Sequence, residues 1–191
     1  MNTNIQKIKY NGLHQVDKFY YDYQNDNNCY TFAINQPLNP YTKEPYSSYE
    51  YCQPGRLGGK RKDNIQDYTR KNFHLLIDLA IKDLRDIGYE MVKSTYEEYV
   101  EDEDCWKIAF TYGDVDYHWY RQNIDGTWSH KKGQQSICDN DKDNKIIYDP
   151  RECNRDEYDV FYGFYLIRKI KNFSLIKFTK MLQMKNLKKK L

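Results

Sequence analysis

The sequence lacks long apolar runs, and its mean hydropathy is −1.01. No segment approaches the roughly 20 consecutive apolar residues that a membrane-spanning helix needs. Residues 1–12 have no apolar core of the kind that defines a secretory signal. We therefore expect a cytoplasmic protein, which lysis or a non-classical route could release from the cell.

Cysteine pairs at metal-binding spacing are also missing. None of the five cysteines forms the C-x-x-C pair that is typical of structural zinc sites. An acidic run at 139–143 imitates the start of a calcium-binding loop, but Asn144 stands where that loop needs glycine and Pro150 where it needs glutamate. We therefore expect no metal and no cofactor. The odd cysteine count predicts free thiols in a reducing compartment, at Cys29, Cys52, Cys105, Cys138 and Cys153.

The net charge of +2 is unevenly distributed along the chain. Residues 168–191 contain nine Lys or Arg and no acidic residue, so residues 1–167 hold all 28 Asp and Glu. We divide the chain into a domain at 1–167 and a basic tail at 168–191. An acidic body is unlike a nucleic-acid-binding domain, so we expect no nucleic-acid partner. The tail predicts either an amphipathic helix that contacts an anionic surface, or an ordinary terminal helix or frayed end.

Tyrosine is in marked excess, with 20 residues in a chain of 191. Its ring combines apolar area with a polar tip, which suits half-buried strands and wet clefts. Tyrosine is also favoured at contact surfaces, so a non-catalytic module that recognises a protein or glycan surface is one reading of the function. A codon bias toward A and T is the simpler account of the excess.

The segment 117–130, which reads YHWYRQNIDGTWSH, predicts a β-hairpin with a histidine on each strand. Asp125-Gly126 is a strong signal for a two-residue hairpin turn. Alternate side chains of a strand share a face, so His118, Tyr120 and Gln122 are expected on one side. Strand pairing can therefore bring the imidazoles of His118 and His130 together.

A short helix is predicted to begin beside the first cysteine. Asn27 or Asn28 can cap this helix and Pro37 must end it, which places Cys29 in its first turn. The backbone N–H groups at a helix start favour an anion, so we expect the pKa of the Cys29 thiol to fall from about 8.5 toward 7 or below. The structural alternative is a buried, inert cysteine.

One long helix and then a series of strands follow. Apolar residues at helical spacing predict a helix over 64–87 that Gly88 ends. Alternating patterns predict strands at 105–112 and at 158–167, and we expect the second of these to be central. The Pro- and Gly-rich loop at 38–63 is predicted to form one wall of a groove.

This order of features resembles the papain-like superfamily of cysteine hydrolases. The hairpin is similar to that of NlpC-like cell-wall peptidases, in which a catalytic histidine opens a strand and a third polar residue, often histidine, lies twelve positions on. His118 and His130 have this spacing, and the helix start at Cys29 is also similar to that of CHAP amidases. The resemblance implies an α+β, papain-like fold, with an N-terminal helix carrying the cysteine and a long helix packed on an antiparallel sheet.

The resemblance also implies a thiol hydrolase that cleaves an amide bond in a peptidoglycan peptide or a protein. It assigns Cys29 as the nucleophile, His118 as the general base and His130 as the residue that orients His118. These roles are chemically consistent, because an imidazole can take the thiol proton and later protonate the leaving amine. The backbone N–H of Cys29 is expected to stabilise the oxyanion, with Gln24 as a candidate second donor.

Overall fold

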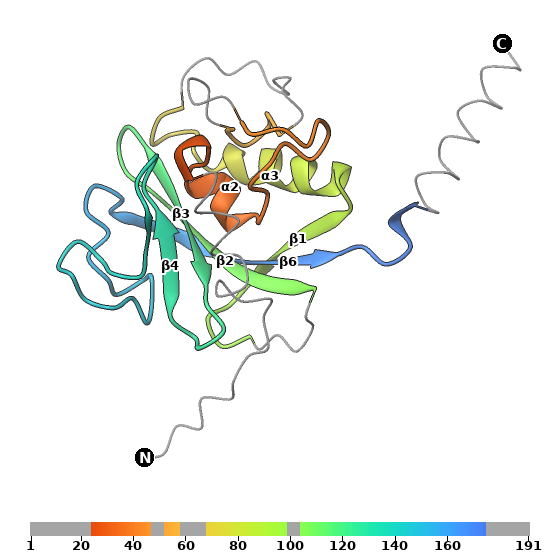
Figure 1. Ribbon diagram of the computed structural model, residues 1–191. Coiled ribbons are helices and arrows are strands. Elements are labelled where there is room, and N and C mark those ends of the chain that lie inside the picture. The colour runs from red at the N-terminus through yellow and green to blue at the C-terminus, as the bar shows by residue number, and fades with distance from the viewer. Residues whose placement is uncertain (1–23, 47–51, 58–67, 99–103, 175–191) are drawn as a thin grey trace, which may run out of the picture.

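The computed structural model describes residues 24–46, 52–57, 68–98 and 104–174 (Figure 1). In this part of the chain, six strands form one sheet in which all neighbouring strands are antiparallel. The strands follow the spatial order β1 (Tyr89–Ser94), β6 (Val160–Lys169), β2 (Cys105–Tyr112), β3 (Tyr117–Gln122), β4 (Trp128–Lys131) and β5 (Ile137–Cys138). The protein is therefore of the α+β class, with an antiparallel sheet as its main element, and no helix in these ranges is long and apolar enough to span a membrane.

Two strand predictions are confirmed by the sheet. The strand at Cys105–Tyr112 has the predicted bounds. Both of its faces are covered, so nearly every residue in it is buried. β6 lies between β1 and β2, as expected of a central strand, but it runs two residues later than predicted. It extends to Lys169 because β1 pairs with it that far, so the first two residues of the expected tail belong to the sheet. The tail from 175 onward lies outside the described residues.

Both helices of the described chain that carry core residues lie on one face of the sheet (Figure 1). α2 (Cys29–Ala33) is short and fully buried, and α3 (Leu75–Asp86) packs against β1. Of the predicted helix at 64–87, residues 64–67 lie outside the described residues, and the helix begins only at Leu75 because residues 70–74 form turns instead. There the side chain of Asn72 accepts a hydrogen bond from the backbone N–H of Thr69 at 2.7 Å. This local contact competes with a regular helical turn.

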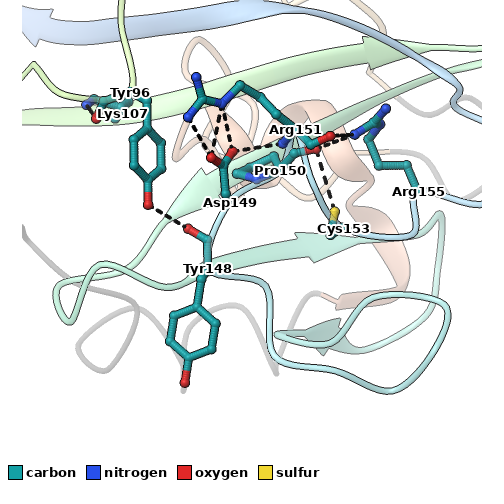
Figure 2. A network of polar contacts seen from close by, with 8 residues as sticks. All are labelled: Tyr96, Lys107, Tyr148, Asp149, Pro150, Arg151, Cys153 and Arg155. Carbon is teal, nitrogen blue, oxygen red and sulfur yellow. Dashed lines mark hydrogen bonds and ion pairs between the residues drawn. The ribbon is translucent and has the colours of Figure 1, made fainter.

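The opposite face of the sheet is covered by the segment 139–159. A second apolar cluster fills the space between them, built from Ala109, Tyr120, Trp128, Ile147 and Phe164. Polar contacts fix the segment in place (Figure 2). The Tyr96 hydroxyl donates to the carbonyl of Tyr148 at 3.2 Å, and Arg155 Nη1 donates to the carbonyl of Pro150 at 2.7 Å. These contacts fix the conformation of the segment, and the segment supplies the Asn140 carbonyl that His130 contacts.

The predicted hairpin is present as β3 and β4, but its turn is longer than two residues. Gln122 pairs with Trp128, so five residues connect the strands. The loop closes by a hydrogen bond from the Asn123 N–H to the Thr127 carbonyl at 2.7 Å, and Gly126 has φ of 90°. This left-handed conformation explains the Asp-Gly signal, which marks the position of the turn but not its length.

Candidate functional site

The cysteine of the predicted site begins α2, and Asn28 caps that helix. The Asn28 side chain accepts hydrogen bonds from the backbone N–H groups of Tyr30 and Thr31, both at 3.1 Å. Thr31 Oγ1 in turn accepts from the Asn28 N–H at 3.1 Å, which completes a capping box. The helix ends at Ala33, before the predicted stop at Pro37. The cap leaves the N–H of Cys29 without a partner among the described residues.

Contacts from three directions hold α2 in position. The Tyr30 hydroxyl donates to Asp83 of α3 at 3.0 Å, and Trp106 Nε1 on β2 donates to the Ala33 carbonyl at 2.8 Å. Lys131 on β4 is fully buried, and its Nζ donates to the carbonyl of Asn27 at 2.7 Å. A five-residue helix has little stability of its own, so these contacts set the position of Cys29.

The Cys29 sulfur lies against the strand that carries His118. The backbone amides of Trp119 and Tyr30 act to lower the pKa of this thiol, which places the sulfur close to β3. Successive side chains of a strand point to opposite faces, so His118 points away from the face of β3 on which Trp119 and α2 pack. Cys29 and His118 nevertheless both line one cleft of about 500 Å³. Gln53, from the predicted groove loop, also lines this cleft.

The two histidines of the hairpin meet through their ring nitrogens. His130 pairs with Tyr120 across the strands, which puts it diagonally opposite His118 on the same face of the sheet. Nε2 of His118 lies 2.8 Å from Nδ1 of His130, and Nε2 of His130 lies 3.0 Å from the carbonyl oxygen of Asn140. A carbonyl only accepts hydrogen bonds, so His130 Nε2 carries a proton. Neutral His130 must then accept at Nδ1, and His118 must donate from Nε2.

The ring of His118 is fixed by packing as well as by this hydrogen bond. Tyr158 stacks on it with ring centroids 4.8 Å apart and an interplanar angle of 16°, and Tyr120 meets it edge-on at 5.1 Å. His118 is 2% exposed. Its Nδ1 has no hydrogen-bond partner among the described residues, so this nitrogen retains a free lone pair in the neutral ring.

A second cavity, of about 270 Å³, is lined by both His118 and His130. His118, Lys132, Gln135 and Tyr158 line both this cavity and the Cys29 cleft, so the two spaces adjoin. Within the described ranges, no three His, Cys, Asp or Glu side chains are grouped so that they could hold a metal ion. The acidic loop at 141–154 instead satisfies its own carboxylates, since Asp141 accepts from the backbone N–H groups of Lys145 and Asn154 at 3.0 Å each.

Comparison with known proteins gives one similarity. No protein-family model matches the chain, and no solved structure matches it. Insoluble matrix shell protein 1 of Ruditapes philippinarum is 29% identical to the chain over 143 residues, which is 73% of this chain and 78% of that protein. The name describes a component of a shell matrix and mentions no chemistry, so the chemistry of the site must be argued from its geometry.

The electrostatics of the resting site differ from the expectation for Cys29. Burial, together with a smaller effect of the Asp116 carboxylate, raises the pKa of the Cys29 thiol to about 12. The amides of Trp119 and Tyr30 act in the opposite direction, as does the charge of Lys131, but they do not outweigh burial. The predicted lowering of the thiol pKa was therefore wrong. Desolvation of the buried sulfur raises the pKa by more than the start of a five-residue helix can lower it.

The histidines are also neutral at rest. Burial lowers the pKa of His118 well below 6.5, and the neighbouring charges of His130 and Lys132 add to this effect. Burial likewise lowers the pKa of His130. At neutral pH the site therefore holds a neutral thiol beside a neutral imidazole, so the thiol would lose its proton during a reaction rather than before it.

Of the four predicted site residues, His118 and His130 are in contact through their ring nitrogens, and Cys29 lines the same cleft as His118. Gln24 begins the 3₁₀ helix η1 (Gln24–Asp26), and its side chain lies outside the described part of the structure. The other cysteines take no part in the Cys29 cleft. Cys52 and Cys105 are buried, Cys153 is half-buried and Cys138 is exposed.

Three residues of this site were missed from the sequence. The contact to the Asn140 carbonyl could not be predicted from the sequence, because every residue has a backbone carbonyl. Lys131 follows His130 and so points to the other face of the sheet, where a lysine is not expected in a core. Tyr117 precedes His118 and lines the Cys29 cleft, but it was one tyrosine among 20.

Proposed function

We propose that this protein is a thiol hydrolase that cleaves amide bonds through Cys29, His118 and His130, with a papain-like arrangement of these residues. The observation that carries the proposal is that Cys29 lines the same cleft as His118, whose ring contacts His130 and, through it, the Asn140 carbonyl. A nucleophile, a base and a group that orients the base are the minimal parts of such a catalyst.

The tautomers support specific roles for the ring nitrogens. The Asn140 carbonyl requires a proton on His130 Nε2, which in turn requires a proton on His118 Nε2. His118 Nδ1 is then the basic nitrogen, on the ring edge away from His130. This nitrogen would accept the Cys29 proton, and His130 would stabilise the imidazolium that results.

The reaction follows from these roles. The Cys29 sulfur forms a bond to the carbonyl carbon while its proton moves to His118 Nδ1, and the carbonyl oxygen becomes an oxyanion near the free N–H of Cys29. His118 then returns the proton to the leaving amine as the C–N bond breaks. A water molecule hydrolyses the resulting thioester, again with His118 as base.

The substrate class is a peptide, from a protein or from peptidoglycan. The Cys29 cleft is large enough for a few residues and is lined mainly by polar groups, including Gln53, Gln134 and Gln135. Amide side chains can hydrogen-bond to the N–H and C=O groups of an extended peptide.

The proposal is tested by covalent labelling and turnover together. The wild-type protein is treated with iodoacetamide near neutral pH and the labelled cysteine is identified by mass spectrometry, while release of p-nitrophenol from p-nitrophenyl acetate measures acylation. We expect labelling at Cys29 that His118→Ala suppresses, and acylation that Cys29→Ser abolishes and the matched control Cys153→Ser retains. Labelling that His118→Ala leaves unchanged would contradict the proposed base.

A non-catalytic binding module is the second candidate. It is favoured by the similarity to an insoluble matrix shell protein, whose name suggests a role in a matrix rather than in catalysis. Exposed aromatic side chains at Tyr41, Tyr148 and Tyr162 would suit such contacts. The two candidates differ in one variant, because Cys29→Ser would leave binding to a matrix polymer intact and would remove all acyl transfer.

A further inference from the structure

The hydroxyl of Tyr117 is buried and has no hydrogen-bond partner among the described residues. Tyr117 is 8% exposed, and its ring is held by contacts with Phe73 at 5.8 Å and Phe110 at 5.9 Å between centroids. A buried hydroxyl that makes no hydrogen bond costs about 1–3 kcal/mol. Such groups are rare in folded proteins and call for an explanation.

The position of this hydroxyl suggests the explanation. Tyr117 lines the same cleft as Cys29, and the Cys29 sulfur is the strongest of the charge partners that raise the Tyr117 pKa. The N–H of Cys29 is likewise without a partner in the described chain. Two unpaired donors therefore belong to residues that line the cleft of the sulfur that would attack a carbonyl carbon.

An oxyanion in acyl transfer is normally bound by two donors. We propose that the Tyr117 hydroxyl is the second oxyanion donor of this site and acts together with the backbone N–H of Cys29. This inference rests on the proposed thiol hydrolase function. It assigns to Tyr117 the role that the sequence suggested for Gln24.

The chemistry of the hydroxyl suits this role. Burial raises the Tyr117 pKa well above 10, so the group stays protonated and able to donate at every pH at which the site would act. A neutral donor does not oppose the neutral thiol at rest and gains strength only when the negative charge appears on the carbonyl oxygen. The transition state therefore receives more stabilisation than the substrate.

The test compares two reactions of Cys29 in Tyr117→Phe. Acylation by p-nitrophenyl acetate passes through a tetrahedral oxyanion and releases p-nitrophenol, whereas alkylation by iodoacetamide displaces iodide and forms no oxyanion. We expect Tyr117→Phe to lower the acylation rate by about 10²–10³-fold, as loss of one oxyanion donor does. The alkylation rate should stay within about two-fold, because the thiol and His118 are untouched.

Tyr112→Phe is the matched control, because Tyr112 packs on the same rings, Phe73 and Phe110, and does not line the cleft. It should leave both rates unchanged. Thermal unfolding should show Tyr117→Phe to be at least as stable as the wild type, since the variant removes an unpaired buried polar group.

The outcomes separate this inference from the function on which it rests. Unchanged acylation in Tyr117→Phe overturns the inference and leaves the hydrolase proposal standing. Equal losses of acylation and alkylation also overturn it, because Tyr117 would then act on the thiol. If wild-type Cys29 reacts with neither reagent, the proposed function itself fails.

Discussion

Nε2 of His118 lies 2.8 Å from Nδ1 of His130, across two strands whose connecting loop is five residues long. The contact fixes which nitrogen of each ring carries a proton only because the Asn140 carbonyl lies 3.0 Å from His130 Nε2. Asn140 is held by its own neighbours, since its N–H donates to Cys138 Sγ at 3.4 Å and Ser129 contacts Asp139. His118, the proposed base, is thus oriented by groups on the face of the sheet that the helices do not cover.

The histidine pair predicts a graded loss of activity. His118→Ala removes the base and should lower acylation of Cys29 by about 10²–10⁴-fold, the usual contribution of a general base. His130→Ala leaves the base but frees its tautomer, so the loss should be smaller. His130→Asn restores an acceptor for the Nε2 proton and should recover part of the rate. Steady-state hydrolysis of p-nitrophenyl acetate checks this order, and a His130→Ala variant as active as the wild type would contradict the role of His130.

The raised thiol pKa predicts an unusual pH profile for alkylation. A free thiol with a pKa of about 12 reacts ten-fold faster for each pH unit up to that pKa. If His118 takes the proton, the rate should instead be flat from pH 6.5 to 8.5, because His118 is already neutral throughout that range. Iodoacetamide labelling of Cys29 at several pH values distinguishes the two cases. His118→Ala should restore the ten-fold slope.

Acid should destabilise the fold before the carboxylates titrate. The pKa values of His118 and His130 are lowered in the folded state, so below pH 6.5 the unfolded chain takes up protons that the folded one does not. The free energy of unfolding is therefore complete above pH 6.5 and falls as the pH drops, by about 1.4 kcal/mol per pH unit for each histidine. The raised pKa of Asp116 acts in the opposite direction and offsets part of this loss.

Urea unfolding between pH 7.5 and 5 measures this slope. His118→Gln removes one of the two groups and should reduce the slope by about half. Constant stability across the window would mean that the histidines are not buried as neutral groups.

Local patterns in the sequence predicted the strands, the helix start at Cys29 and the contact between His118 and His130, because alternation, capping and turn signals act over a few residues. The cap at Asn28 and the face shared by the histidines are such cases. The rest depended on contacts distant in sequence. The pKa of Cys29 depends on burial by the whole fold, and Lys131 Nζ reaches a carbonyl 104 residues away. The Asn140 carbonyl could not be found at all without the path of the chain.

The buried lysine beside Cys29 gives the last prediction. Lys131 is fully buried, its Nζ donates to the carbonyls of Asn27 and Gly133, and burial lowers its pKa to about 8. Its positive charge favours the negative charge that develops on the Cys29 sulfur as the proton leaves, so Lys131→Met should slow alkylation of Cys29 at pH 7. The difference between variant and wild type should shrink as the pH rises through about 8, because wild-type Lys131 then loses its charge as well.

The chain offers a matched control for this variant. Lys107 is also fully buried and donates from Nζ to two carbonyls, those of Tyr96 at 2.9 Å and Glu98, on the face of the sheet shown in Figure 2. Both Lys→Met variants leave two carbonyls without a donor and should cost about 1–3 kcal/mol of unfolding free energy, measured in urea. Only Lys131→Met should change the alkylation rate. Equal slowing in both variants would mean that Cys29 responds to general destabilisation and not to the neighbouring charge.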